Sequence, residues 1–399
     1  MTETPSDRQL RVAMIGYGFM GAAHSQGWRV APRFFDLPAD PSMRVVVGRD
    51  SAAVSAAAEK WGWAEVSTDW REIIARDDID VVDIVTPGDT HAEIAIAALE
   101  AGKHVLCEKP LSNTVAEAEA MTDAAARAAE RGVRSMVGFT YRRVPAATFA
   151  RDLVAAGRIG EIRQVRASYR QDWLMDAEAP LTWRMKKDRA GSGALGDIGA
   201  HAINLSEFIT GLRLESVSGV LDTIVTERPL LAEGVGLSGT ASTERGEVTV
   251  DDIALFSGRF ANPGGRYAPL GAFEATRFAT GRKNALRVEV SGSLGAVAFD
   301  LERLNELEFY DATLPATELG FRRILVTEHD HPYMAPWWPT GHMLGYEHGF
   351  SHQVVDFVNA IAAGEQPRPS FADGLHVQRV LDAVEQSSIA GSTWIATED

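Results

Sequence analysis

The feature that most constrains the fold is a glycine-rich turn near the start of the chain. An apolar run over residues 11–15 leads into a Gly-x-Gly-x-x-Gly sequence over 16–21, and residues of helical composition follow. In such a strand–turn–helix the first glycine makes the tight turn, the second lets the main chain approach a pyrophosphate, and the third lets the helix pack on the strand. The helix N-terminus then attracts phosphate. The pattern predicts a dinucleotide-binding fold, and a glycine turn that binds no ligand is the alternative. The residues assigned to the cofactor here are Gly16, Gly18, Phe19, Met20 and Gly21.

Length and charge limit the kind of partner. The 399 residues suggest two domains, and a formal charge of −16 argues against nucleic acid and anionic membrane surfaces. Cys107 is the single cysteine, so no internal disulfide forms. Residues 1–8 are polar and lack the apolar core of a secretory signal, and no apolar run reaches the roughly 18 residues of a membrane helix. We therefore expect a cytoplasmic protein that contacts neither nucleic acid nor membrane.

The first third of the chain alternates between strand-like and helix-like segments. This alternation predicts βαβ units with a parallel sheet, and hence a dinucleotide-binding Rossmann domain over residues 1–140. We expect an irregular insertion over 31–38, before the second strand. The later expected strands are 43–47, 80–87, 103–107 and 133–139, and the expected helices are 51–61, 91–100 and 114–131.

The pattern changes near Tyr141. Several later segments alternate with a period of two, as Leu286, Val288 and Val290 do, which predicts strands with one buried face. We expect residues 141–399 to form an α+β domain with a large, mainly antiparallel open sheet. Its expected strands are 162–169, 212–224, 247–260, 272–280, 286–290 and 296–301, and its expected helices are 146–156, 350–363 and 373–387.

Two residues after the second strand bear on the cofactor type. Asp50 is placed to accept a hydrogen bond from a ribose 2′-hydroxyl, which favours NAD. Arg49 is placed to stack on adenine or to pair with a 2′-phosphate, which favours NADP. An ordinary solvated surface pair is an equal alternative, so the choice between NAD and NADP stays open.

Glu108-Lys109-Pro110 follows a predicted strand. Ligands of doubly wound sheets bind outside the carboxyl ends of the strands, so Lys109 is expected to face the cofactor cleft. A lysine there polarises a carbonyl or assists proton transfer from a hydroxyl. Taken alone, the residue is better explained as an ordinary exposed loop lysine.

Asp197 and His201 are four residues apart, on a segment expected to be helical as far as Ile209 and ended by Gly211. The spacing puts both on one helix face, with Asp197 in the first turn, where the helix dipole favours a carboxylate. His201 titrates near neutral pH and suits a general acid or base. A purely structural hydrogen bond between the two is the alternative.

Taken in this order, the glycine turn, Glu108-Lys109-Pro110 and Asp197-x-x-x-His201 resemble the Gfo/Idh/MocA family of sugar and polyol oxidoreductases over essentially the whole chain. Within that family the chain looks most like levoglucosan- or inositol-type dehydrogenases. The resemblance implies that Lys109 is the catalytic lysine, Asp197 the substrate-side aspartate and His201 the catalytic histidine. It also implies a homodimer or homotetramer built on the outer sheet face. The further residues that it assigns to the cofactor cleft are Thr86, Pro87, His91 and Glu108.

The resemblance implies oxidation of a secondary hydroxyl of a sugar, anhydrosugar or cyclic polyol by hydride transfer to NAD or NADP. The family often has an acid where Arg49 stands, which again leaves the cofactor type open. Two alternatives are an NAD-dependent glycosidase that uses transient oxidation and a non-catalytic, cofactor-sensing regulator.

Five further residues are candidates for binding the substrate, although domain-hinge and core-packing roles explain them equally well. Hydroxyl and guanidinium groups donate hydrogen bonds to a sugar, and aromatic faces suit its C–H surfaces. The candidates are Tyr141, Arg142, Trp173, Trp183 and His342. His348 and His352 have helical spacing, but no third ligand is evident, so no metal site is expected.

Overall fold

A computed structural model describes residues 9–235, 238–262 and 264–397. They form two compact units, one made of the residues up to Thr140 with Gly345–Leu375, the other of Tyr141–Leu344 with the residues from His376 onward. The limits expected from the sequence, 1–140 and 141–399, differ from this division in residues 345–375. The reason is a shared core, because Phe357 and Val354 of helix α9 (His348–Ala363) are buried in one cluster with Trp28.

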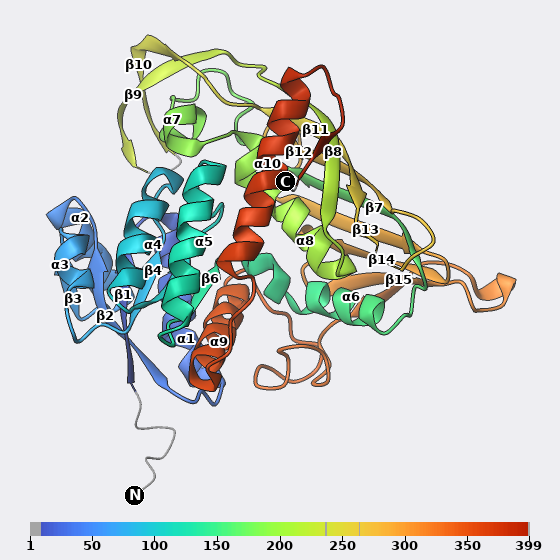
Figure 1. Ribbon diagram of the computed structural model, residues 1–399, viewed down its shortest axis with the longest axis horizontal. Coiled ribbons are helices and arrows are strands. Elements are labelled where there is room, and N and C mark those ends of the chain that lie inside the picture. Colours follow the sequence, from blue (N-terminus) through green and yellow to red (C-terminus); the bar gives the residue numbers. More distant parts are fainter. Residues whose placement is uncertain (1–8, 236–237, 263, 398–399) are drawn as a thin grey trace, which may run out of the picture. The chain divides into compact units, whose positions relative to one another are not determined.

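The first unit contains a six-stranded sheet in the order β3-β2-β1-β4-β5-β6, and every strand pair is parallel (Figure 1). Strand β4 at its centre is fully buried and carries Val81, Val82 and Ile84, as is usual when helices cover both faces of a parallel sheet. This is the predicted Rossmann arrangement. The strands are β1 (Gln9–Ile15), β2 (Asp40–Val47), β3 (Glu65–Ser67), β4 (Val81–Ile84), β5 (His104–Cys107) and β6 (Ser135–Val137).

The helices of this unit begin and end at residues with clear local causes. Helix α2 ends where Gly62 adopts the left-handed conformation, with φ 84°. Helix α5 starts with a capping box between Thr114 and Glu117. Besides α9, the helices are α1 (Phe19–Phe34), α2 (Ser51–Trp61), α3 (Trp70–Ile74), α4 (His91–Glu100), α5 (Val115–Ala129) and α10 (Phe371–Ile389), which crosses into the second unit.

The insertion predicted over residues 31–38 is wrong in its first part. Helix α1 continues through Pro32 to Phe34, because Trp28 and Ala31 bury their side chains in the core and hold this last turn in place. Proline in a last turn removes only one hydrogen-bond donor, which this packing offsets. Strand β3 and helix α3 were not predicted, since each has five residues or fewer.

The order of the strands reverses between β1 and β4, which are neighbours in the sheet. In doubly wound sheets the ligand crevice lies outside the carboxyl ends of the strands at such a point. The segments that follow β1 and β4 are the glycine turn and the loop with Thr86 and Pro87. The topology therefore brings two separately predicted segments to one edge of the sheet.

The second unit contains a nine-stranded sheet in the order β16-β15-β14-β13-β7-β12-β11-β8-β17. Only β7 and β12 pair in parallel, so the sheet is mainly antiparallel, as predicted. Its strands are β7 (Ile162–Arg170), β8 (Leu214–Asp222), β11 (Ile253–Phe260), β12 (Leu270–Thr276), β13 (Ala285–Gly292), β14 (Gly295–Asp300), β15 (Glu306–Asp311), β16 (Arg322–Leu325) and β17 (Ile395–Ala396).

Helices α6 (Pro145–Ala155) and α8 (Ala200–Thr210) pack against one face of this sheet (Figure 1). Side chains alternate along β11, where Ala254 and Phe256 are buried while Leu255 between them is half exposed. The uncovered face also carries Val220 and Leu270.

The prediction of one strand over 247–260 is wrong. Strands β9 (Glu227–Val235) and β10 (Ser238–Glu247) form a separate two-stranded sheet, and β11 starts only at Ile253. The carboxylate of Asp251 interrupts the run by accepting main-chain hydrogen bonds from another segment. Among the described residues, no helix combines the length and apolarity that crossing a membrane requires.

Candidate functional site

The glycine turn has the shape that a pyrophosphate requires. Gly16 has φ 113°, and a Cβ there would lie 2.9 Å from the carbonyl oxygen of Val85. A Cβ on Gly21 would lie 2.9 Å from the carbonyl oxygen of Gly16, whereas a Cβ on Gly18 would meet no atom within 4 Å. No side chain caps α1 at Gly18, so its first N–H groups are left for a ligand. These residues fit a dinucleotide. Phe19 is exposed, and Met20 packs on the core.

The loop after β4 is tied to the segment after β5 by His91. This buried ring has Nδ1 3.0 Å from the carbonyl oxygen of Pro110 and Nε2 2.9 Å from that of Thr86. Thr90 also donates a hydrogen bond to the hydroxyl of Thr86, at 2.7 Å. The His91 side chain therefore contacts main-chain carbonyl groups of both segments and shapes the edge of the expected cofactor cleft. Thr86 and Pro87 are half-buried along that edge.

Asp50 is the N-cap of α2 and accepts a hydrogen bond from the main-chain nitrogen of Ala53 at 2.9 Å. Asp50 and Arg49 are both exposed at the carboxyl end of β2, where a ribose is expected. Tyr17, which the sequence analysis did not single out, packs on Gly48 so closely that a Cβ there would overlap its ring. The presence of a tyrosine inside the glycine turn is the sequence feature that could have indicated this contact.

Glu108 is buried, and its carboxylate faces inward. Its Oε1 lies 3.0 Å from Nε2 of His24, and its Oε2 accepts the main-chain N–H of Lys109 at 3.1 Å. The structure thus assigns Glu108 to a contact with His24 rather than to an open cleft wall. Lys109 itself is half-buried, two residues after the last residue of β5.

In the second unit, Asp197 lies in a π-helical turn, Leu195–Gly199, that leads into α8. The expectation of a first α-helical turn is therefore wrong for Asp197, and His201 belongs to α8 itself. The cause is Asp251, which accepts the main-chain N–H groups of Gly193 and Leu195, both at 2.7 Å. Burial raises the pKa of Asp251, against the effect of Arg277 and these hydrogen bonds.

Two arginines face Asp197. Nη1 of the fully buried Arg277 lies 3.9 Å from Oδ2 of Asp197, and Nη2 donates to the carbonyl oxygen of Asp251 at 3.1 Å. Burial lowers the pKa of Arg184, the charge of Asp197 raises it, and Arg277 lowers it further. A carboxylate beside two guanidiniums is suited to accept hydroxyl hydrogen bonds.

His201 is buried beside the rings of two tyrosines. Its ring centroid lies 4.5 Å from that of Tyr141 and 5.9 Å from that of Tyr169. The two tyrosine hydroxyls are 2.9 Å apart, and Tyr169 donates to Oδ1 of Asn284 at 2.6 Å. Tyr141 therefore donates to Tyr169, and the row of polar groups is oriented.

Gln171 extends this row, because it donates to Asn284 at 2.8 Å and accepts the indole N–H of Trp173 at 2.9 Å. Such a row of hydroxyl and amide groups beside a histidine is suited to bind a polyhydroxylated ligand. Tyr141 and Trp173 were predicted from the sequence, whereas Tyr169, Gln171 and Asn284 were not. The period-two pattern that ends at Tyr169 was the one signal available for them.

The remaining candidates have other surroundings. Arg142 donates to Oδ1 of Asn204 on α8 at 2.7 Å, which fixes it to the helix that carries His201. Trp183 packs against the guanidinium of Arg184, whose Cζ lies 4.4 Å from the ring centroid. His342 is exposed in a turn, with Nδ1 2.8 Å from the carbonyl oxygen of Pro339. None of these contacts is to His201 or Asp197.

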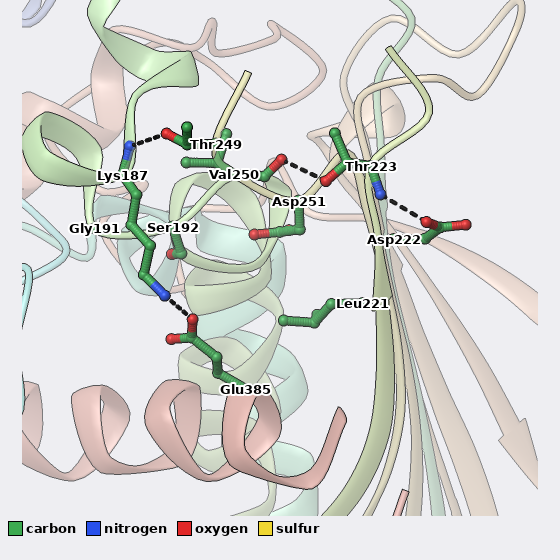
Figure 2. Close-up of a pocket in the computed structure, with 10 residues that line it drawn as sticks. All are labelled: Lys187, Gly191, Ser192, Leu221, Asp222, Thr223, Thr249, Val250, Asp251 and Glu385. Carbon is green, nitrogen blue, oxygen red and sulfur yellow. Dashed lines mark hydrogen bonds and ion pairs between the residues drawn. The ribbon is translucent and has the colours of Figure 1, made fainter. Parts of the chain in front are cut away.

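A cavity of about 280 Å³ in the second unit is lined by Lys187, Ser192, Asp251 and Glu385, among others (Figure 2). Lys187 forms an ion pair with Glu385 across it, and its main-chain nitrogen donates to Thr249 at 2.8 Å. The hydroxyl of Thr223 donates to the carbonyl oxygen of Val250 at 2.9 Å. These contacts join the segments that line the cavity to one another.

Within the part of the chain that the structure describes, no group of three His, Cys, Asp or Glu side chains could hold a metal ion. His352 is fully buried against the ring of Phe35, and Nδ1 of His348 accepts the main-chain N–H of Gly345 at 3.0 Å. His348 and His352, the pair with helical spacing, thus make contacts within the folded chain.

Comparison with known proteins identifies the family. The profile of the oxidoreductase family with an NAD-binding Rossmann fold matches residues 10–139, and that of the GFO/IDH/MocA C-terminal domain matches residues 148–298. Levoglucosan dehydrogenase of Pseudarthrobacter phenanthrenivorans is 41% identical over 97% of this chain and 98% of its own length. The chain belongs to the Gfo/Idh/MocA oxidoreductase family.

Solved structures of family members agree. Levoglucosan dehydrogenase in complex with NADH and L-sorbose has a TM-score of 0.91 at 40% identity, over 98% of this chain and all of that one. An oxidoreductase domain protein from Kribbella flavida has a TM-score of 0.92 at 62% identity, over the same shares. In a comparison of sequences alone, inositol 2-dehydrogenase of Rhizobium meliloti is 26% identical over 95% of this chain and 96% of its own length. The first domain of the chain described here is thus an NAD-binding Rossmann domain.

Proposed function

We propose that this oxidoreductase oxidises a secondary hydroxyl of a sugar, anhydrosugar or cyclic polyol, with levoglucosan as the first substrate to test. The observation that carries the proposal is the second unit's cluster of His201, Tyr141 and Tyr169, in which a histidine is buried among oriented hydroxyl groups. The similarity to levoglucosan dehydrogenase supports the anhydrosugar in particular.

Each proposed catalytic residue has a role that its chemistry allows. His201 accepts the proton of the reacting hydroxyl, and Lys109 stabilises the alkoxide that develops. Asp197, held by Arg277, accepts hydrogen bonds from neighbouring sugar hydroxyls and orients the ring. When bound, the nicotinamide ring supplies the acceptor for the hydride of the carbinol carbon.

The cofactor is proposed to be NAD rather than NADP. Gly16, Gly18 and the N-terminus of α1 would hold its pyrophosphate, and Asp50 would accept a hydrogen bond from the ribose 2′-hydroxyl. The exposed Arg49 would lie over adenine in this assignment. Three levoglucosan dehydrogenase structures that contain NADH support the choice.

Net oxidation is favoured over the two other functions considered, glycoside cleavage by transient oxidation and non-catalytic sensing. Two of the relatives named above, levoglucosan dehydrogenase and inositol 2-dehydrogenase, are dehydrogenases, which supports net turnover of the cofactor. We also propose a cytoplasmic homodimer or homotetramer that buries the exposed sheet face with Val220, Leu255 and Leu270.

The test is a panel of levoglucosan, pyranoses and inositols assayed with NAD and with NADP, following the absorbance of the reduced cofactor. Lys109→Met and His201→Asn should each lower kcat by at least about a hundredfold while NADH still binds. Lys60→Met, on the exposed side of α2, is the matched control. Turnover of Lys109→Met near that of the control would refute the assigned role, and oxidation of no member of the panel would refute the substrate class.

A further inference from the structure

A buried cluster of three ionisable groups lies beside Lys109. One of them, Glu108, belongs to the Glu-Lys-Pro motif, and the proposed chemistry uses none of the three. His24 on α1 has Nδ1 2.9 Å from Oδ2 of Asp83 on β4, and Nε2 3.0 Å from Oε1 of Glu108. The side chains of His24, Asp83 and Glu108 are 1%, 0% and 5% exposed. Because both ring nitrogens face carboxylates, both must carry hydrogens, and His24 is an imidazolium.

The electrostatic surroundings agree with this protonation state. Burial lowers the pKa of His24, but the charge and hydrogen bond of Asp83, followed by those of Glu108, raise it from 6.5 to about 10. The other groups at the ring are neutral. Trp28 donates its indole N–H to Asp83 at 2.7 Å, and the ring of Phe350 on α9 lies 5.3 Å away between centroids. Burial raises the pKa of the adjacent Cys107 thiol, which stays protonated.

Glu108 has little freedom to move. His24 holds Oε1, and a Cβ on Gly138 would lie 2.6 Å from that same oxygen, so the main chain at Gly138 closes the other side. Oε2 accepts the main-chain N–H of Lys109 at 3.1 Å. A chain of contacts thus runs from Asp83 through His24 and Glu108 to the main chain of Lys109.

This arrangement is a costly way to hold a fold together. Burying three ionisable groups carries a desolvation penalty, and apolar side chains of similar volume often stabilise a protein as well or better. Helix α1, which carries His24, is also the helix whose N-terminus fits the pyrophosphate. The cluster therefore links the helix expected to hold the cofactor to the lysine expected to act on the substrate.

We propose that His24 is a positioning residue for Lys109, acting through Glu108, so that an imidazolium buried under the sheet edge fixes where the lysine emerges. The proposal rests on the proposed function of Lys109. Misplacement of a reacting group by about 1 Å costs roughly a hundredfold in rate. Loss of the link should consequently lower kcat, while the affinity for the cofactor stays unchanged.

The test compares Glu108→Ala with Glu108→Gln. Glutamine keeps an acceptor for the Lys109 N–H and turns its NH2 group towards Nε2 of His24, which can accept that hydrogen only as a neutral imidazole, whereas alanine removes both contacts. Glu108→Ala and His24→Gln should lower kcat roughly tenfold to a hundredfold, and Glu108→Gln should retain it within about threefold. The dissociation constant of NADH, measured by fluorescence titration, should change by less than about threefold in all three variants.

Asp80→Asn is the matched control. It removes an ion pair with Arg11 at the opposite end of the sheet, just before β4 begins, and reports what lost stability alone does to kcat. A kcat of Glu108→Ala equal to that of Glu108→Gln, after correction by this control, would overturn the proposal. Equal losses in kcat and in NADH affinity would also overturn it, because they indicate general disruption.

The charge of His24 has an independent measure in case His24→Gln does not fold. In wild-type protein with ¹⁵N-labelled histidine, one ring should keep the nitrogen shifts of an imidazolium at about pH 8.5, well above the usual histidine range. The nitrogen shifts of that ring should change in Glu108→Gln. If every histidine ring of the wild-type protein is neutral at about pH 8.5, the proposal is overturned. Full activity of Lys109→Met would instead contradict the proposed function, whereas an inactive Lys109→Met with a fully active Glu108→Ala would contradict only the role of His24.

Discussion

The carboxylate of Asp197 lies 3.9 Å from the guanidinium of Arg277, a side chain with no exposed surface. Arg277 also donates to two main-chain carbonyl oxygens, that of Asp251 at 3.1 Å and that of Arg184 at 3.5 Å. Arg277 therefore connects Asp197 to the segment that holds its turn.

Arg277→Lys should weaken substrate use without affecting the cofactor. Lysine has one nitrogen and cannot face Asp197 and the two carbonyl groups together. Loss of one charge-assisted contact, about 1.5 kcal/mol, corresponds to a fall of roughly tenfold in kcat/KM for the sugar. Arg228→Lys is the control, because Arg228 is equally buried but donates to the carbonyl oxygens of Leu174 and Asp176. Equal effects of the two variants on kcat/KM would count against a specific role of Arg277.

Gly193→Ala should displace the turn of Asp197. A Cβ on Gly193 would overlap the carbonyl oxygen of Asp251, while the carbonyl oxygen of Gly193 accepts the main-chain N–H of Asp197 at 3.0 Å. We expect a loss of roughly 2–4 kcal/mol in the free energy of unfolding and little remaining turnover. Gly320→Ala, where a Cβ meets no atom within 4 Å, should be neutral in both. Urea unfolding and steady-state kinetics of the two variants check this, and a fully active Gly193→Ala would contradict it.

The glycines of the N-terminal turn should separate into two kinds. Gly21→Ala should destabilise the fold by roughly 1–3 kcal/mol, because its Cβ would press on the carbonyl oxygen of Gly16. Gly18→Ala should leave the thermal midpoint nearly unchanged but weaken NADH binding about tenfold or more, because its Cβ would point into open space where the pyrophosphate is expected. Thermal unfolding and fluorescence titration measure the two effects. NADH affinity unchanged in Gly18→Ala would place the phosphates elsewhere.

The parts of the fold that were predicted correctly are those with strong local signals. Runs such as Val81-Val82-Asp83-Ile84 are apolar enough to indicate buried parallel strands, and Gly62 and Thr114 mark helix ends by their own conformational preferences. The irregular insertion was wrong because Pro32 suggested a break, whereas packing of Trp28 and Ala31 maintained the helix. Tertiary contacts of this kind leave no periodic pattern in the sequence.

The candidate site divides in the same way. Lys109, Asp197 and His201 belong to short motifs and could be named from the sequence. The contact between Glu108 and His24 that supports Lys109 could not be predicted, because the two residues are 84 apart in the chain and meet only through the strand order of the sheet. Asp83 shows the difficulty best, since a carboxylate inside an apolar strand gives no indication of its partner.

Asp50→Asn should alter cofactor preference without loss of stability. Asparagine caps a helix as well as aspartate does, so the contact with Ala53 is retained while the charge is removed. Less repulsion of a 2′-phosphate should raise kcat/KM with NADP roughly threefold to tenfold relative to NAD. Asp69→Asn, at the N-cap of α3, is the matched control and should change neither ratio nor stability. An unchanged ratio in Asp50→Asn would remove Asp50 from the ribose site.

The stability of the first unit should depend on pH through His24. Its pKa is about 10 in the folded chain and near 6.5 when unfolded, so its contribution is fully present below about pH 6.5 and is lost as the pH rises towards 10. In Glu108→Gln one of the two carboxylates that raise this pKa is gone, and the fall should begin at lower pH. The thermal midpoint of the wild type should therefore be higher than that of Glu108→Gln, and the difference should be largest near neutral pH. The difference should narrow towards about pH 10, because His24 is then neutral in both proteins. Thermal unfolding followed by circular dichroism at a series of pH values measures this margin. Asp80→Asn, which leaves the His24 cluster intact, should show a constant difference from wild type over the same interval, and a constant margin for Glu108→Gln would mean that His24 is not charged in the folded protein.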